Sequence, residues 1–281
     1  MRAVVLDEAG QPRLADIAAP EGEAAVRVLA CGLCGSDVEK IGRAPAGTVL
    51  GHEVAAETGD GRRVALVHHL SCGECERCRG GHESTCEQFR AATIEPGGFA
   101  ERATARGGWV ELPDAVDDVL GSYAEPLACV LRGAERVPRG DVLVLGGGFV
   151  GRLFEAVLRH RGDTVFVRDR DSARSGPEPT GPVGTVVLCA PAAGDDALAA
   201  VEPGGTVLLF AHPGRLETGE VYRRELSLVG SRSATPHHLE QAVRLLPVLE
   251  FPQALVLPLE RFEDGLAAYR SREALKVVFR P

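Results

Sequence analysis

A glycine-rich turn after a short apolar run constrains the second half of the chain more than any other feature. Residues Val142–Leu145 lead directly into Gly146, Gly148 and Gly151, which have the spacing G-x-G-x-x-G. These glycines permit a tight turn, a close approach of the backbone to a pyrophosphate, and close packing of a helix on a strand. Residues Phe149–His160 have the apolar periodicity of a helix. The sequence therefore predicts a strand, a turn and a helix whose first N–H groups face phosphates.

Strands and helices alternate on either side of this turn. Further strand-like runs lie at Thr164–Arg168, Gly184–Cys189 and Thr206–Phe210, with a helical segment near Asp195–Val201. This alternation predicts a parallel sheet built of right-handed crossovers, and thus an α/β nucleotide-binding domain. Only Arg170–Val183 separates the second strand from the next, which is too short for a helix plus a full strand. We therefore expect one strand–helix unit to be missing and about five strands in place of six.

Asp169 follows the second strand and bears on the choice of cofactor. A carboxylate at this place accepts hydrogen bonds from an adenosine ribose and repels a 2′-phosphate, which favours NAD over NADP. Arg168 and Arg170 flank it, and either side chain could instead accept a 2′-phosphate. The missing unit lies on the adenosine side, so cofactor affinity is the part of the function it affects most.

Four closely spaced cysteines predict a metal site. Cys72, Cys75, Cys78 and Cys86 form C-x2-C-x2-C-x7-C. Four thiolates complete a closed tetrahedron around Zn²⁺ and leave no position for a substrate, so this zinc is expected to be structural. The nearby histidines are interpreted as surface or packing residues, although they could replace a cysteine as ligand: His68, His69 and His82.

A second, mixed set of metal-binding residue types lies earlier in the chain. Cys34 occurs in CGLCGSD, and His52 and Glu53 follow in GHE. A thiolate, an imidazole and a carboxylate suit a catalytic zinc, which keeps one position for substrate and lowers the pKa of an alcohol oxygen. By spacing alone these residues could also be ordinary core residues. Cys31 and Cys34 could alternatively form a redox pair.

Bulk properties exclude several classes of partner. The net charge of −9 disfavours nucleic acid. No stretch has the roughly 18 consecutive apolar residues of a membrane span, and the N-terminus lacks the apolar core of a signal peptide. We therefore expect a cytoplasmic protein without membrane partners, whose cysteines are thiols or metal ligands. The β-like first third and the later strand–helix pattern predict two domains, residues 1–126 with 255–281 and residues 127–254.

In combination these segments resemble the zinc-dependent medium-chain dehydrogenase family, and most closely its polyol (sorbitol-like) and threonine dehydrogenase branches. The resemblance covers nearly the whole chain. It implies a GroES-like β-rich catalytic domain joined to a Rossmann domain, with the C-terminal segment returning to the catalytic domain, and assembly as a homodimer or homotetramer. Besides the cysteine lobe, the matching segments are Cys31–Asp37, Gly51–Glu53, Gly97–Glu101 (GGFAE), Ala124–Ala128 (AEPLA) and Gly146–Gly151 (GGGFVG).

The resemblance also implies roles for individual residues. Cys34 and His52 would bind the catalytic zinc, and Glu53 would be either a ligand or the carboxylate that exchanges with water. Glu125 matches an acidic residue near zinc in the polyol branch, as a ligand or through a water. Ser36 matches the hydroxyl that takes the substrate proton.

One departure from the family pattern concerns the path of the proton. Glu39 stands where many relatives have a histidine that passes the proton to solvent, and a glutamate could perform or break this step.

The sequence leads to one main hypothesis and two alternatives. The main hypothesis is reversible oxidation of a secondary alcohol, such as a polyol or amino alcohol, with hydride passing to the nicotinamide. A biosynthetic ketone or imine reductase running in reverse would use the same residues. A zinc-stabilised binding protein with an impaired nucleotide site is the third reading.

Overall fold

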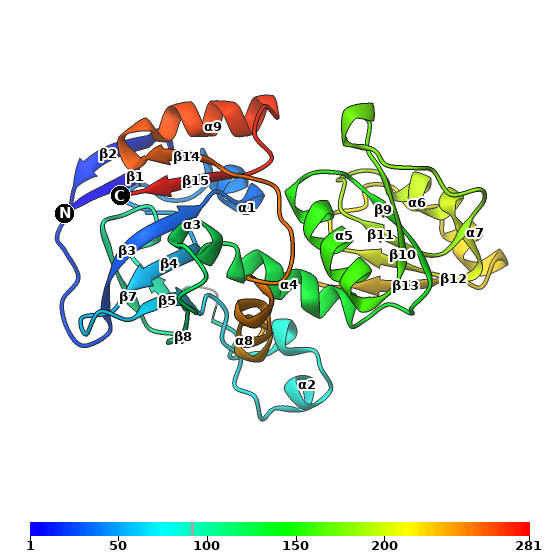
Figure 1. Ribbon diagram of the computed structural model, residues 1–281, viewed down its shortest axis with the longest axis horizontal. Coiled ribbons are helices and arrows are strands. Elements are labelled where there is room, and N and C mark those ends of the chain that lie inside the picture. The colour runs from blue at the N-terminus through cyan, green and yellow to red at the C-terminus, as the bar shows by residue number, and fades with distance from the viewer. Residues whose placement is uncertain (91–92) are drawn as a thin grey trace. The chain divides into compact units, whose positions relative to one another are not determined.

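The computed structural model describes residues 1–90 and 93–281, and the chain divides into two compact units (Figure 1). The first unit comprises residues 1–128, 234–248 and 253–281, and the second comprises 129–233 and 249–252. The sequence placed 234–248 in the second domain, and the structure corrects this. Among the described residues, no helix has the length and apolarity needed to cross a membrane.

The second unit contains a five-stranded sheet in which every neighbouring pair is parallel. Its strand order is β10-β9-β11-β12-β13. Helix α5 (Phe149–Arg161) follows the first strand of the unit, and α6 (Gly194–Ala200) and α7 (Thr218–Arg223) follow later strands. The strands are β9 (Asp141–Leu145), β10 (Thr164–Arg168), β11 (Val183–Leu188), β12 (Val201–Leu209) and β13 (Ser227–Gly230).

The connection between β10 and β11 contains only a one-turn 3-10 helix, η2 (Ser172–Arg174), so the strand number is the five expected. This leaves β10 at the edge of the sheet, where unpaired backbone groups invite association. The chain covers this edge itself. The Gly176 amide donates to the carbonyl of Val167 at 2.8 Å, and the Arg159 guanidinium donates to that of Val165 at 3.3 Å.

The glycine turn has the geometry that its sequence predicts. Gly146 has a φ of +109°, and a Cβ on Gly151 would lie 1.8 Å from the Gly146 carbonyl oxygen. A larger residue at position 151 would therefore push α5 off β9. Gly148 caps the N-terminus of α5, so the first free N–H groups of the helix face the turn.

The first unit is built on an eight-stranded sheet with the order β14-β15-β3-β4-β5-β8, to which β7 adds through β3 and β6 through β7. A separate pair, β1 (Arg2–Leu6) and β2 (Pro12–Asp16), is antiparallel. The strands of the larger sheet are β3 (Ala25–Gly32), β4 (Glu53–Glu57), β5 (Arg63–Leu66), β6 (Ile94–Glu95), β7 (Arg102–Ala105), β8 (Trp109–Glu111), β14 (Leu255–Pro258) and β15 (Val277–Arg280).

The C-terminal segment closes the core of this unit. Strand β15 pairs antiparallel with β3, and α9 (Phe262–Ser271) packs on β15. The ring of Phe262 stacks on that of Phe279 at 4.7 Å between centroids and meets that of Phe99 edge-on at 5.0 Å. The return of the C-terminus to the first domain, expected from the family resemblance, is what the structure shows.

Helix α8 (Pro236–Leu245) explains the corrected domain boundary. Thr235 caps it, and Pro236 occupies its first position. The buried residues Leu239, Ala242 and Val243 lie on one face, and the helix contacts β8 of the first unit. The amphipathic pattern predicted the helix but could not show which sheet its apolar face covers.

Candidate metal centres and nucleotide site

The mixed set of metal-binding residues converges at the end of β3 and the start of β4. Cys34 precedes α1 (Gly35–Lys40), and His52 and Glu53 lie where β4 begins. One ligand atom from each residue lies within 4.8 Å of the other two. A sulfur, an imidazole nitrogen and a carboxylate oxygen at this separation match the donor set of a catalytic zinc.

Asp37, the last residue of the CGLCGSD motif, holds this arrangement in place, a role that the motif alone does not reveal. Its buried carboxylate accepts hydrogen bonds from the amides of Cys34 at 3.1 Å and Gly51 at 3.2 Å, and contacts Nδ1 of His52 at 3.2 Å. Although burial opposes ionisation, His52 and these amides hold the pKa of Asp37 below its usual value. Because Asp37 occupies Nδ1, the Nε2 atom of His52 is the one available to a metal.

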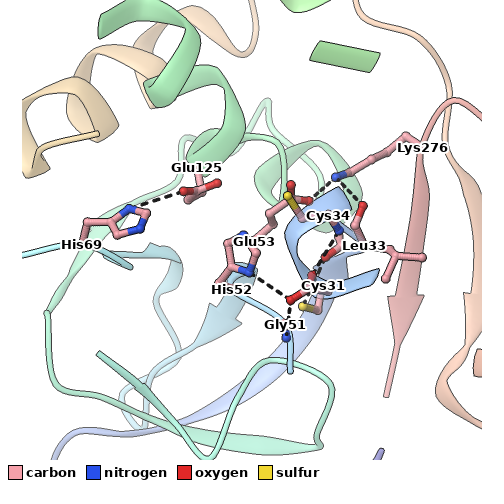
Figure 2. Close-up of polar contacts among 11 residues, drawn as sticks. Cys31, Leu33, Cys34, Gly51, His52, Glu53, His69, Glu125 and Lys276 are labelled. Atoms are coloured by element: carbon pink, nitrogen blue, oxygen red, sulfur yellow. Dashed lines mark hydrogen bonds and ion pairs between the residues drawn. The ribbon is translucent and has the colours of Figure 1, made fainter. Parts of the chain in front are cut away.

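Lys276 is the second residue that sequence reasoning missed. Its amine, on the segment before β15, forms an ion pair with Glu53 and donates to the carbonyl of Leu33 at 3.2 Å (Figure 2). The two charged residues are 1% and 2% exposed. A buried carboxylate requires such a partner. The one available signal was that the chain has only two lysines, Lys40 and Lys276.

Glu125 lies outside this three-residue group and contacts a histidine. It occupies the first turn of α4 (Ala124–Ala134), and its Oε1 lies 3.7 Å from Nδ1 of His69 (Figure 2). Of the two alternatives for His69, a surface or a packing residue, the structure favours packing, because its side chain is only 14% exposed. The ring of His68 also lies inside, and burial and the imidazoles of His52 and His69 lower its pKa far below the ordinary value, so it is neutral.

The two proposed proton-transfer residues share α1. Ser36 and Glu39 are exposed and three residues apart, so they are neighbours on one face of the helix. Ser36 is two residues from Cys34 in the chain, and its side chain is exposed.

The four cysteines of the lobe lie close enough together to share one metal ion. Their Sγ atoms are separated by 3.4 Å for Cys75 and Cys78, 3.5 Å for Cys86 and Cys72, and 3.8 Å for two further pairs. A tetrahedron with zinc–sulfur bonds of about 2.3 Å has edges of about 3.8 Å, so the donors fit Zn²⁺. Amide hydrogen bonds from Glu74 and Cys75 lower the pKa of Cys72 to about 6, whereas burial raises that of Cys78 to about 11, so Cys72 is the more readily ionised of the two thiols.

In the second unit, the glycine turn and the end of β10 contact each other. The amide of Gly147 donates to Asp169 at 2.7 Å, and that of Asp171 donates to its other oxygen at 2.9 Å. Arg168 pairs with Glu178 through two nitrogens, at 2.6 and 3.0 Å. Arg170 is exposed.

Comparisons with known proteins agree with this architecture. The family described as "Alcohol dehydrogenase GroES-like domain" matches residues 20–114. The chain is 30% identical to a D-altritol 5-dehydrogenase of Agrobacterium fabrum over 297 residues, covering 88% of each protein. It is 27% identical to a sorbitol dehydrogenase of Halalkalibacterium halodurans, covering 91% of each. Among solved structures, a zinc-binding dehydrogenase of Sinorhizobium meliloti bound to NADP superposes with a TM-score of 0.82 at 27% identity, covering 100% of this chain and 99% of that one.

The two-unit fold, the grouped donors and these relatives together show that the chain belongs to the zinc-dependent medium-chain dehydrogenase family. It is an oxidoreductase that acts on an alcohol with the help of zinc and a nicotinamide cofactor.

Proposed function

We propose that the protein oxidises a secondary alcohol of the polyol class to a ketone, reversibly, with NAD as hydride acceptor. The convergence of Cys34, His52 and Glu53 within 4.8 Å supports this most directly. The names of the relatives point the same way, because an altritol and a sorbitol dehydrogenase are among them.

Cys34 and His52 would hold the catalytic zinc, with Glu53 as a third ligand or as the carboxylate that exchanges with water, and Glu125 nearby. When bound, zinc supplies a Lewis acid that polarises the alcohol oxygen and lowers its pKa. Asp37 fixes the His52 ring, so the donor geometry is set before substrate arrives.

The proton of the alcohol would leave through α1. The hydroxyl of Ser36 accepts it, and the carboxylate of Glu39 passes it to solvent from the exposed face of the helix. Glu39 thus takes the part that a histidine has in many relatives.

The second unit would bind the cofactor through Gly146, Gly148, Gly151 and the N-terminus of α5. Asp169 would accept the ribose hydroxyls. Two features favour NAD over NADP: the carboxylate of Asp169 repels a 2′-phosphate, and Arg168 is already paired with Glu178. Of the two arginines that flank Asp169, this leaves Arg170 as the one that could bind a 2′-phosphate.

The cysteine lobe would hold a structural zinc, since all four of its donors are sulfur and close a tetrahedron. Assembly as a homodimer or homotetramer is proposed from the family resemblance.

The test combines cofactor binding with a substrate screen. Fluorescence titrations with NADH and with NADPH are expected to give saturable binding that is tighter for NADH, and a panel of polyols is expected to show NAD-dependent turnover. Cys34→Ser should lose the catalytic zinc and turnover while still binding NADH. Cys129→Ser, the matched control, should keep its zinc, its turnover and its NADH binding. A Cys34→Ser protein with full zinc content and full turnover would contradict the proposal.

A further inference from the structure

Two adjacent histidines connect the metal group to Glu125. The ring of His68 lies 4.5 Å from that of His52, and the ring of His69 lies 4.0 Å from that of His68, measured between centroids. Nδ1 of His69 then lies 3.7 Å from the carboxylate of Glu125. Three imidazoles thus run from a proposed zinc ligand to the first turn of α4.

A small pocket opens beside this row of rings. Its polar lining is formed by His68, His69, Glu125 and Thr235, and its apolar lining includes Ala128 and Leu239. The space open to the centre of a water molecule is about 10 Å³, which is room for one water or one hydroxyl group. The pocket is therefore a place for a single polar group rather than for a whole substrate.

His68 presents an unused hydrogen-bonding atom. Its Nδ1 is buried and has no hydrogen-bond partner in the part of the chain that the structure describes. Leaving such a group unsatisfied costs about 1–3 kcal/mol, so buried polar atoms without partners call for an explanation.

The backbone at His68 is held in place by a neighbouring side chain. The hydroxyl of Thr93 donates to the carbonyls of Val67 at 2.5 Å and His68 at 2.8 Å. A ring that is fixed at its backbone and packed between two other rings, tilted by 31° and 55°, is oriented in advance for a ligand.

We propose that His68, together with the His69–Glu125 pair, forms a subsite for a second hydroxyl group of the substrate, on the carbon next to the one that is oxidised. The inference rests on the proposed alcohol oxidation and specifies its substrate class as vicinal diols and polyols. His52 would bind the zinc that holds the reacting oxygen, and the ring of His68 lies 4.5 Å from that of His52, so a hydroxyl that His68 reaches would be a near neighbour of the reacting one. His69 and Glu125 supply both a donor and acceptors, which is the complement of a hydroxyl group. A monohydric alcohol would leave these groups unpaired, and this is how such sites discriminate.

The experiment compares two alcohols with the same carbon skeleton, 2,3-butanediol and 2-butanol. The wild-type protein is expected to favour the diol in kcat/KM. His68→Phe keeps an aromatic ring but has no nitrogen, and it should lower the diol-to-monool ratio about tenfold with little change for 2-butanol. His237→Phe, an exposed histidine on α8, is the matched control and should leave the ratio unchanged. Zinc content is measured for each variant, because a ratio that changes only together with zinc loss would overturn the subsite.

A binding measurement separates this inference from the function on which it rests. In the zinc-loaded protein, 2,3-butanediol should shift the NMR signals of the His68 ring, assigned by their absence from His68→Phe, and 2-butanol should not. Equal shifts with both alcohols, or an unchanged kinetic ratio in His68→Phe, would overturn the subsite while leaving alcohol oxidation standing. If neither alcohol binds or is turned over, both the subsite and the proposed alcohol oxidation are overturned.

Discussion

At the scale of single residues, the proposed catalytic centre depends on partners that are distant in the chain. Glu53 meets Lys276, which is 223 positions away, in a pair that is almost completely buried. Desolvation of two charges offsets much of their attraction, so such a pair contributes little net stability compared with apolar residues. Removing one member, however, leaves an uncompensated buried charge.

Lys276→Met is therefore expected to lower the free energy of unfolding by about 3–5 kcal/mol, because Glu53 loses its counter-charge. The double variant Glu53→Gln with Lys276→Met should lose less than the sum of the single variants. Urea unfolding of zinc-free protein measures both effects, because a bound zinc would give Glu53 a second counter-charge. Lys40→Met replaces the other lysine, which is exposed, and should change stability by less than about 0.5 kcal/mol. Additive losses in the double variant would show that the two charges do not interact.

At the scale of elements, the short connection after β10 has two roles. It covers the edge of the sheet through the amide of Gly176, and it brings Glu178 to Arg168. The pairing raises the pKa of the Arg168 guanidinium and lowers that of Glu178, so both remain charged across the ordinary pH range. The same segment that replaces a strand–helix unit therefore also pairs with the cation next to Asp169, the proposed ligand of the ribose.

Glu178→Gln should release Arg168 to meet a 2′-phosphate. We expect the NADPH-to-NADH affinity ratio to rise about three- to tenfold, a modest change because the pair is solvent-exposed. Fluorescence titration with both cofactors measures it. Glu220→Gln, which breaks an exposed ion pair with Arg223 in the same unit, serves as control. If Glu178→Gln and Glu220→Gln give the same NADPH-to-NADH affinity ratio, the ion pair of Arg168 with Glu178 has no part in the choice of cofactor.

At the scale of the whole molecule, the proposed binding sites for zinc and for the cofactor lie in different units. Both metal groups lie in the first unit, and the glycine turn with Asp169 lies in the second. A ligand stabilises the part of a protein whose native state binds it. Zinc and the cofactor should therefore protect different parts of the chain from local opening.

Chelation of zinc is expected to increase amide hydrogen exchange around residues 34–53 and 72–86, while strands β9 to β12 keep their protection. NADH should instead slow exchange at Gly146–Gly151. Hydrogen exchange followed by mass spectrometry, with and without chelator and cofactor, tests both statements. An equal loss of protection in β9 to β12 after chelation would show that the units open together.

Much of this organisation was readable from local spacing. The glycine turn, four of the five strands and the helix after the turn follow from residues within a few positions of one another, whereas β13 was not identified. The grouping of the lobe cysteines likewise follows from their two-residue spacings. The pairing of Cys34 with His52 required the family resemblance, because 17 intervening residues leave their separation in space undetermined by spacing.

By itself, the sequence determined the local geometry of this protein: which segments are strands, where glycine is sterically required, and which thiols can share an ion. Tertiary structure alone decided that α8 packs on the first unit, that Lys276 neutralises Glu53, and that His69 meets Glu125. The physical reason is that period and spacing specify directions within a turn or two of chain. The partner of a buried charge or an apolar face is chosen by the packing of segments that are far apart in sequence.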